Sequence, residues 1–166
     1  MKKLLPSQAR LKELLDYEPL TGALVWKSHQ RRTDYIGKPA GNTTPGGRRS
    51  VCIDFEHYQA HRLIWMWMTG NDPAEKEVDH IDRNPLNNCW DNLRLATHSQ
   101  NMRNCKDKSR SGLPKGVQKQ QLSNRFMSRI RKDGKVHYLG TFDTPEEAHQ
   151  AYCSAAADLH GEFAAV

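Results

Sequence analysis

The segment at residues 78–104, VDHIDRNPLNNCWDNLRLATHSQNMRN, constrains the fold more than any other part of the chain. Two short extended runs, 77–81 and 93–96, enclose a long polar loop. Thr97 followed by Gln100 is a capping-box signature, which predicts a helix that runs to about residue 106. The segment therefore predicts a strand, a long polar loop, a second strand and a helix.

Polar side chains of this segment have the chemistry of a hydrolytic site. Asp79 falls on the first strand and Asn101 on the helix, and we expect these two elements to pack against each other. Oxygen donors that converge in this way suit a hard divalent cation, in the first place magnesium, with manganese as the alternative. His80 points to the other side of the strand and can act as a general base on water. Such a site hydrolyses phosphodiesters.

The spacing H-x11-N-x8-N closely resembles the HNH nuclease motif of phage and mobile-intron endonucleases. The surrounding run HIDRNPLNNxxxNLRLAT matches the family pattern as well. A bare His-Asn-Asn spacing would often arise by chance, whereas this run of matches would not. The resemblance implies that His80 is the catalytic base and that Asn92 braces the loop. It also implies that Asp79 and Asn101 hold the metal, with an oxygen-preferring ion favoured over zinc because the third motif position is Asn.

Other polar residues near the motif have simpler interpretations. Asn88 is interpreted as a turn residue, because Asn commonly bonds its own backbone in loops. His98 lies at no matching position and is expected to face solvent or touch phosphate. In the preceding HR pair, His61 is expected to be buried and structural, while Arg62 faces phosphate.

Charge is distributed unevenly along the chain. Residues 103–140 hold eleven Lys or Arg and two acids, a net charge of +9 in a chain whose total is +6, so the remainder carries −3. A basic block is either a solvated face or a nucleic-acid-binding surface, and beside a nuclease site the second interpretation is favoured. The residues expected to contact DNA are Arg62, Arg94, Arg103, Lys115, Lys119, Arg125, Arg129, Arg131 and Lys135.

The composition KDKSRSG near residues 107–113 predicts a linker between two domains. The expected boundaries are a nuclease domain at 1–107 with its core at about 76–107, a linker at 108–113 and a second domain at 114–166. In the first domain the patterns predict helices at 7–15 and 61–69, the latter ended by Gly70. They also predict a strand within 17–26, a loop at 31–47, and strands at 51–55 and 58–60 joined by a turn at 56–57.

The second domain is predicted to be three strands followed by a helix. The strands are expected at 116–118, 125–131 and 136–142, with Asp133-Gly134 as the hairpin turn between the last two. Thr144-Pro145-Glu146-Glu147 is a helix start, and the helix after it is expected to bury Ala148, Ala151, Tyr152, Ala155, Ala156 and Leu159. The basic residues of the strands would then leave the opposite sheet face positive.

This second domain looks like the APETALA/ethylene-response-factor DNA-binding domain, which also occurs fused to phage HNH nucleases. The matching runs are KGV, RFMSRI, YLGTF and AYCSAAADLHGEFA, within residues 112–166. The resemblance implies that the sheet enters the major groove, where bases can be distinguished. Phe126 and Tyr138 replace the usual Trp, and Gln118 replaces a common Arg, so the family's target sequence does not transfer.

Composition excludes several classes of protein. A mean hydropathy of −0.83 and the lack of a long apolar run argue against a membrane protein. Four scattered cysteines without a CxxC pair argue against a zinc knuckle and against a disulfide framework. They fit the reducing cytoplasm, and if the chain is phage-encoded we expect this to be the cytoplasm of a bacterial host.

The sequence as a whole predicts an α+β chain with a ββα-metal nuclease domain, followed by a small three-stranded antiparallel sheet packed on one helix. The expected function is a metal-dependent, site-preferring endonuclease that nicks or cuts double-stranded DNA without an organic cofactor. A monomer is expected, with a dimer left open. The alternatives are a non-catalytic DNA-binding regulator that retains the nuclease fold, and a nuclease for RNA or branched DNA.

Overall fold

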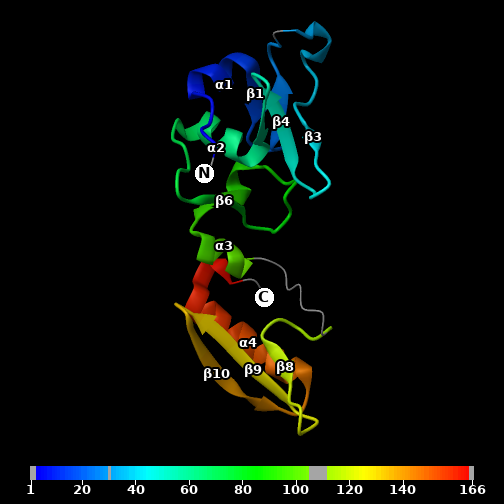
Figure 1. Ribbon diagram of the computed structural model, residues 1–166, viewed down its shortest axis with the longest axis vertical. Coiled ribbons are helices and arrows are strands. Elements are labelled where there is room, and N and C mark those ends of the chain that lie inside the picture. The colour runs from blue at the N-terminus through cyan, green and yellow to red at the C-terminus, as the bar shows by residue number, and fades with distance from the viewer. Residues whose placement is uncertain (1–2, 30, 105–111, 165–166) are drawn as a thin grey trace. The chain divides into compact units, whose positions relative to one another are not determined.

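The computed structural model describes residues 3–29, 31–104 and 112–164, which form small antiparallel sheets and short helices (Figure 1). The chain falls into two compact units, Met1–His98 and Ser99–Val166. Most of the predicted linker, residues 108–111, lies outside the described residues, and the domain boundaries stay a prediction. No helix in the described part of the chain is long and apolar enough to span a membrane.

The first unit begins with α1 (Gln8–Leu14), whose start is capped because the Ser7 side chain accepts a hydrogen bond from the Arg10 amide. Next comes a hairpin of β1 (Leu15–Glu18) and β2 (Ala23–Trp26), of which the sequence predicted only the second strand. The predicted loop at 31–47 contains the short helix η1 (Thr33–Tyr35) and the two-residue strand β3 (Asn42–Thr43).

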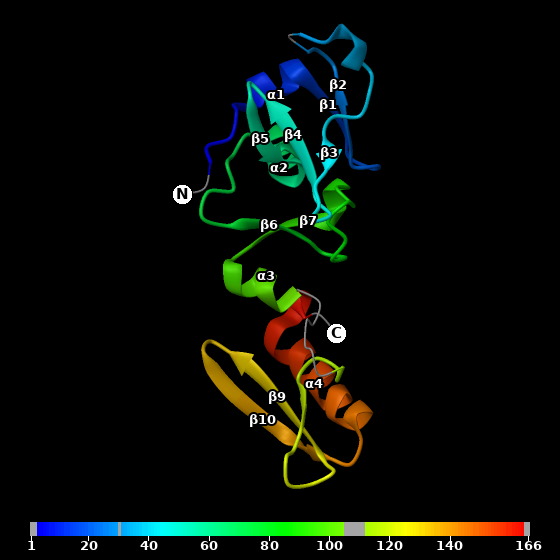
Figure 2. The ribbon, with the colours of Figure 1, turned by 45° about the vertical axis from the view of Figure 1, so that its right-hand side comes forward.

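Strand β3 pairs with β4 (Arg49–Ile53), which pairs with β5 (Glu56–Gln59) (Figure 2). The turn predicted at 56–57 was wrong, because the chain reverses at Asp54 and Phe55, both with positive φ. Positive φ at both central residues matches the right-handed twist of a two-residue hairpin, so residues 56 and 57 remain in the strand.

Helix α2 (Ala60–Thr69) follows and ends at Gly70, as predicted. Its apolar residues Leu63 and Ile64 are fully buried against Leu11 of α1 and Val51 of β4, in the main core of the unit. The antiparallel pair β6 (Glu77–His80) and β7 (Leu93–Ala96) closes this unit. The loop between them ends in the short helix η2 (Trp90–Asn92).

The second unit contains nearly all of α3 (His98–Asn104), then β8 (Val117–Lys119), β9 (Phe126–Lys132) and β10 (Lys135–Phe142). The three strands form an antiparallel sheet in the order β10-β9-β8, and Asp133 and Gly134 turn the β9–β10 hairpin as predicted. Helix α4 (Pro145–His160) opens with the predicted capping box and is followed by the short helix η3 (Gly161–Phe163).

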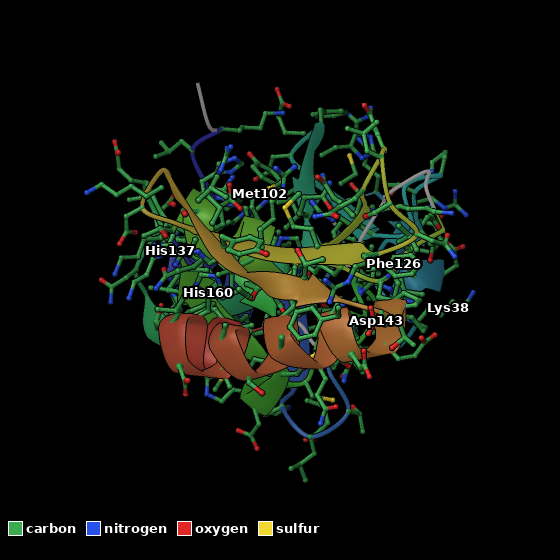
Figure 3. The ribbon with its side chains drawn as sticks, turned by 90° about the horizontal axis from the view of Figure 1, so that it is seen from below. Lys38, Met102, Phe126, His137, Asp143 and His160 are labelled. Carbon is green, nitrogen blue, oxygen red and sulfur yellow. The ribbon has the colours of Figure 1, made fainter. Side chains whose placement is uncertain are left out.

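Helix α4 covers one face of this sheet (Figure 3). Ile130 of β9 packs in one core cluster with Tyr152 and Ala156 of α4. The prediction that six residues of this helix are buried is confirmed for three, Ala148, Tyr152 and Ala156, while Ala151, Ala155 and Leu159 are only partly buried. Gly116 permits this packing, because a Cβ there would lie 2.0 Å from the Tyr152 ring. The unit is thus a small three-stranded sheet with a close-packed helix on one side.

Candidate active site and nucleic-acid surface

The β6–β7 pair places Asp79 opposite Arg94 and His80 opposite Leu93. Directly opposed residues project from the same face of a sheet, and successive residues project from opposite faces. Asp79 therefore meets Arg94, whose Nε donates a hydrogen bond of 3.0 Å to the Asp79 Oδ2 atom. The two side chains are only 6% and 11% exposed, so a carboxylate predicted to bind metal is fixed by an arginine predicted to contact DNA.

His80 is buried at the end of β6 and contacts the loop that follows. Its Nε2 lies 3.1 Å from Oδ1 of Asn88, which is itself only 3% exposed. The Asn88 Nδ2 donates to the carbonyl of Leu86 at 3.4 Å, which is the arrangement expected if Oδ1 faces the imidazole. Burial is the main cause that lowers the pKa of His80, so the neutral ring dominates at neutral pH.

His61 of α2 packs against this imidazole. The ring centroids of His61 and His80 are 5.1 Å apart and their planes are inclined by 72°, an edge-to-face contact. Burial first, and then the charges of His80, Arg48 and Arg62, lower the pKa of His61 to about 3. His61 is therefore a buried neutral residue that limits where the His80 ring can move, in line with its predicted structural role.

Asn92 ties the two ends of the β6–β7 loop together. Its Nδ2 donates to Oδ1 of Asp82 at 2.9 Å and to the carbonyl of Asn87 at 2.7 Å. Its Oδ1 accepts a hydrogen bond of 3.0 Å from the Asp82 amide. The Asn92 side chain is thus hydrogen-bonded to both backbone and side-chain groups of the loop. These bonds fix the loop backbone on both sides of Asn88.

The turn between β1 and β2 supports the same loop from the outside. The Tyr17 hydroxyl donates to the Asn88 carbonyl at 2.8 Å, and the Trp90 amide donates to the Pro19 carbonyl at 2.9 Å. Gly22, with φ of 71°, permits this approach, because a Cβ there would lie 2.4 Å from the Asn88 carbonyl carbon. The backbone of Asn88 is therefore fixed independently of its side chain.

Asn88 is the residue of this site that sequence reasoning missed. The sequence favours a turn residue at this position, whereas the Asn88 side chain is buried and hydrogen-bonded to His80. A signal was present, because Asn88 belongs to the LNN part of the run that matched the family pattern. The simpler interpretation is favoured from the sequence because Asn is common in loop turns.

The metal donors predicted from the sequence are one carboxylate and one amide. Asp79 lies in the first unit, and Asn101 lies on α3 in the second, so their convergence stays a prediction. Across residues 3–29, 31–104 and 112–164, no group of three or more His, Cys, Asp and Glu could hold a metal ion. Of the predicted pair, only Asp79 belongs to these four residue types, because Asn101 is an amide. Both side chains supply oxygen donors of the kind that magnesium takes.

Several of the predicted DNA contacts are engaged within their own units. Arg62 pairs with Asp72 at 3.3 Å and Arg103 with Asp133 at 3.4 Å. The Lys115 Nζ donates to the Arg103 carbonyl at 2.7 Å, which joins α3 to the start of the second unit's sheet.

The open face of the second unit's sheet carries two of the remaining predicted cations, Arg129 and Arg131, together with exposed apolar side chains. Arg129 and Arg131 are exposed and alternate with the buried Ser128 and Ile130, so they project away from α4. Across the strand pair they lie opposite Tyr138 and Val136, which are 63% and 51% exposed.

The edges of this sheet differ from its open face. Arg125 pairs with Asp143 at 2.9 Å, near the end of the sheet that Phe126 and Asp143 mark in Figure 3. Lys119 and Lys135 are both exposed. Lys119 lies two residues after the buried Val117 on β8, so it projects from the same face of the sheet as Val117 and not from the open face.

Comparisons with known proteins agree with this site. A model of the HNH endonuclease family matches residues 58–103, which include β6, β7 and their loop. The chain is 42% identical over 152 residues to an uncharacterized HNH endonuclease of Acanthamoeba polyphaga mimivirus, an alignment that covers 91% of this chain and 71% of the relative. It is 35% identical over 113 residues to Protein 3.8 of Escherichia phage T7, covering 66% of this chain and 93% of that protein.

No solved structure matches the chain. The alignment with the mimivirus protein extends over most of both sequences. The chain therefore belongs to the HNH endonuclease family and is a phosphodiester hydrolase.

Proposed function

We propose that the chain is a divalent-metal-dependent DNA endonuclease in which His80 takes a proton from the attacking water. The observation that carries the proposal is the 3.1 Å contact between the His80 Nε2 and the Asn88 Oδ1. A buried, neutral imidazole held in one orientation has the properties that a general base requires at neutral pH.

The contact with Asn88 selects one tautomer of His80. An amide oxygen can only accept a hydrogen bond, so the Nε2 of the neutral ring carries the hydrogen. The Nδ1 atom is then the nitrogen that accepts the proton of water. The hydroxide oxygen attacks phosphorus, the bond to the 3′ oxygen breaks, and the leaving oxygen takes a proton from solvent.

Asp79 and Asn101 are the residues that would hold the metal. The metal would neutralise charge on the scissile phosphate, and the chain's own part is to present a carboxylate in a fixed position. Arg94 provides that fixation, because its hydrogen bond and charge restrain the Asp79 side chain on the β6–β7 pair. Magnesium fits this oxygen donor set better than zinc does.

The second unit would position the nuclease on duplex DNA through the open face of its sheet. Arg129 and Arg131 project from that face beside Val136 and Tyr138. A three-stranded sheet with exposed arginines suits the major groove and the adjacent phosphates. The strand order, the hairpin turn and the capped helix support the proposed likeness to the APETALA/ethylene-response-factor domain.

A nicking assay tests the proposed function. Purified protein is incubated with supercoiled plasmid and magnesium, and nicked and linear products are separated on a gel. We expect cleavage that EDTA stops, and a loss of roughly 10²–10⁴-fold in His80→Ala with DNA affinity nearly unchanged. His57→Ala, which removes an exposed imidazole from β5, serves as the control. Parent-like cleavage by His80→Ala, or full activity in excess EDTA, would contradict the proposal.

A further inference from the structure

The first unit has a basic segment that the overall charge balance conceals. Residues 27–49 contain six Lys or Arg and one acid, Asp34, although the chain outside residues 103–140 carries a net negative charge. Arg32 pairs with Asp34 at 2.8 Å, which engages the segment's acid, and Lys27 pairs with Asp16 of β1 at 3.6 Å. The remaining cations give this flank of the first unit a positive potential of the kind that attracts nucleic acid.

Arg48 ends the turn that joins β3 to β4 within this segment. The Thr44 amide donates to the Arg48 carbonyl at 2.7 Å, and the Thr44 hydroxyl donates to the same carbonyl at 3.0 Å. The Gly47 amide donates to the Thr44 carbonyl at 2.9 Å. These bonds close the turn on itself and give the Arg48 backbone a fixed position.

The same turn lies beside the β6–β7 pair in both views of the ribbon (Figure 1 and Figure 2). In agreement with that placement, the positive charge of Arg48 acts on both His61 and His80, where it adds to the effect of burial. Arg48 is exposed, and within the described part of the chain it forms no ion pair. An arginine fixed at the edge of the site, with its charge directed to solvent, is available to an anion.

We propose that Arg48 binds a backbone phosphate of the DNA next to the catalytic His80. The inference rests on the proposed function, because it assumes that DNA lies across the β6–β7 site. Arginine is suited to this task because its planar guanidinium can donate two parallel hydrogen bonds to phosphate oxygens. Arg48 would thus supply a contact from the first unit that is independent of the second unit's sheet.

Binding without cleavage provides the test. Full-length His80→Ala protein, with and without Arg48→Gln, is titrated against a short labelled DNA duplex in EDTA at several salt concentrations. We expect Arg48→Gln to raise the Kd roughly 10-fold or more, as the loss of a charged hydrogen bond does. We also expect the slope of log Kd against log salt to fall by about one. Because His80 is absent from both proteins, an effect of Arg48 on its protonation cannot produce this result.

Two further variants complete the design. Arg48→Lys keeps the charge and should keep the salt slope, whereas Lys12→Gln removes an exposed charge from α1 and should change neither quantity. A Kd and slope for Arg48→Gln equal to those of the parent would overturn the proposal, as would an equal loss in Lys12→Gln. Thermal denaturation identifies variants that are unfolded. If the unmodified protein failed to cut plasmid, the proposed function would fail while this binding test remained readable.

Discussion

The Asn88 Oδ1 atom lies 3.1 Å from the His80 Nε2 atom, and both side chains are less than a tenth exposed. This contact restrains the imidazole at one nitrogen, and the edge-to-face contact with the His61 ring restrains it further. An imidazole held in this way would lose little orientational freedom if water and phosphate bound beside it. The orientation of His80 is therefore built into the fold before the substrate binds.

Removing the Asn88 amide should impair catalysis without unfolding the protein. Asn88→Ala should lower kcat by about 10²-fold, the typical effect of misplacing a reacting group, with little change in KM. Nitrogen NMR of the His80 ring should show the hydrogen on Nε2 in the parent and a mixture of tautomers in the variant. The Asn71→Ala change, at an exposed site after α2, should affect neither measurement. An unchanged kcat in a folded Asn88→Ala protein would remove Asn88 from the mechanism.

The ion pair between Asp79 and Arg94 decides how the proposed metal ligand must be tested. Asp79→Ala would leave the buried Arg94 without this carboxylate, which typically costs about 3–5 kcal/mol, so lost activity could reflect unfolding. Asp79→Asn keeps the shape and an acceptor oxygen for the Arg94 Nε. We therefore expect Asp79→Asn to remain folded but to need far more magnesium for cleavage. Parent-like magnesium dependence in that variant would exclude Asp79 as a ligand, and Asp91→Asn is the control.

Local signals explain which parts of the fold could be predicted from the sequence. The β9–β10 turn and the start of α4 follow from Asp133-Gly134 and from the Thr144 capping box, where a few adjacent residues determine the backbone. The β4–β5 turn could not be predicted in the same way. Its second residue, Phe55, has a φ of 68°, a conformation that bulky side chains seldom adopt.

The residues of the candidate site could likewise be predicted from the sequence only where local signals determine them. The motif spacing singles out His80 and Asn92, and in the structure both side chains contact the β6–β7 loop. The role of Asn88 depends on contacts that sequence spacing does not reveal, such as the bond from Tyr17, which lies 71 residues away. Likewise, the sequence predicts only that Arg94 contacts DNA. The strand register places Arg94 opposite Asp79, to which its Nε donates a hydrogen bond.

The buried His61 predicts that acid destabilises the fold. Its pKa is lowered from 6.5 to about 3, mainly by burial, so between these values the unfolded chain binds a proton that the folded chain does not. Its contribution to stability is therefore fully present above pH 6.5 and is lost as the pH falls toward 3, at up to about 1.4 kcal/mol per pH unit. Denaturant titrations at several pH values should show this slope, and His61→Phe should reduce it. An unchanged slope in His61→Phe would contradict the assignment, with His57→Gln as the control.

The close approach of Gly22 to the site loop can be tested against a second glycine. Gly22→Ala introduces a Cβ 2.4 Å from the Asn88 carbonyl carbon, so we expect a loss of about 1–3 kcal/mol and slower cleavage. Gly37→Ala has nearly the same positive φ but meets nothing within 4 Å, so it reports backbone strain alone. The difference between the two free energies of unfolding measures the contact with the loop. Equal losses would show that the β1–β2 turn does not support Asn88.

Substitutions on the open face of the second unit's sheet should weaken DNA binding more than substitutions on the exposed side of α4. Arg131→Gln removes one positive charge from that face, whereas Ser154→Glu adds one negative charge to the exposed side of α4, so both change the net charge equally. If the sheet binds phosphates, Arg131→Gln should weaken duplex binding more and reduce the salt slope by about one. Gel-shift titrations at two salt concentrations measure both effects. Equal losses in the two variants would indicate that the second unit attracts DNA only through its overall charge, and a loss confined to Ser154→Glu would place the DNA on the helical side.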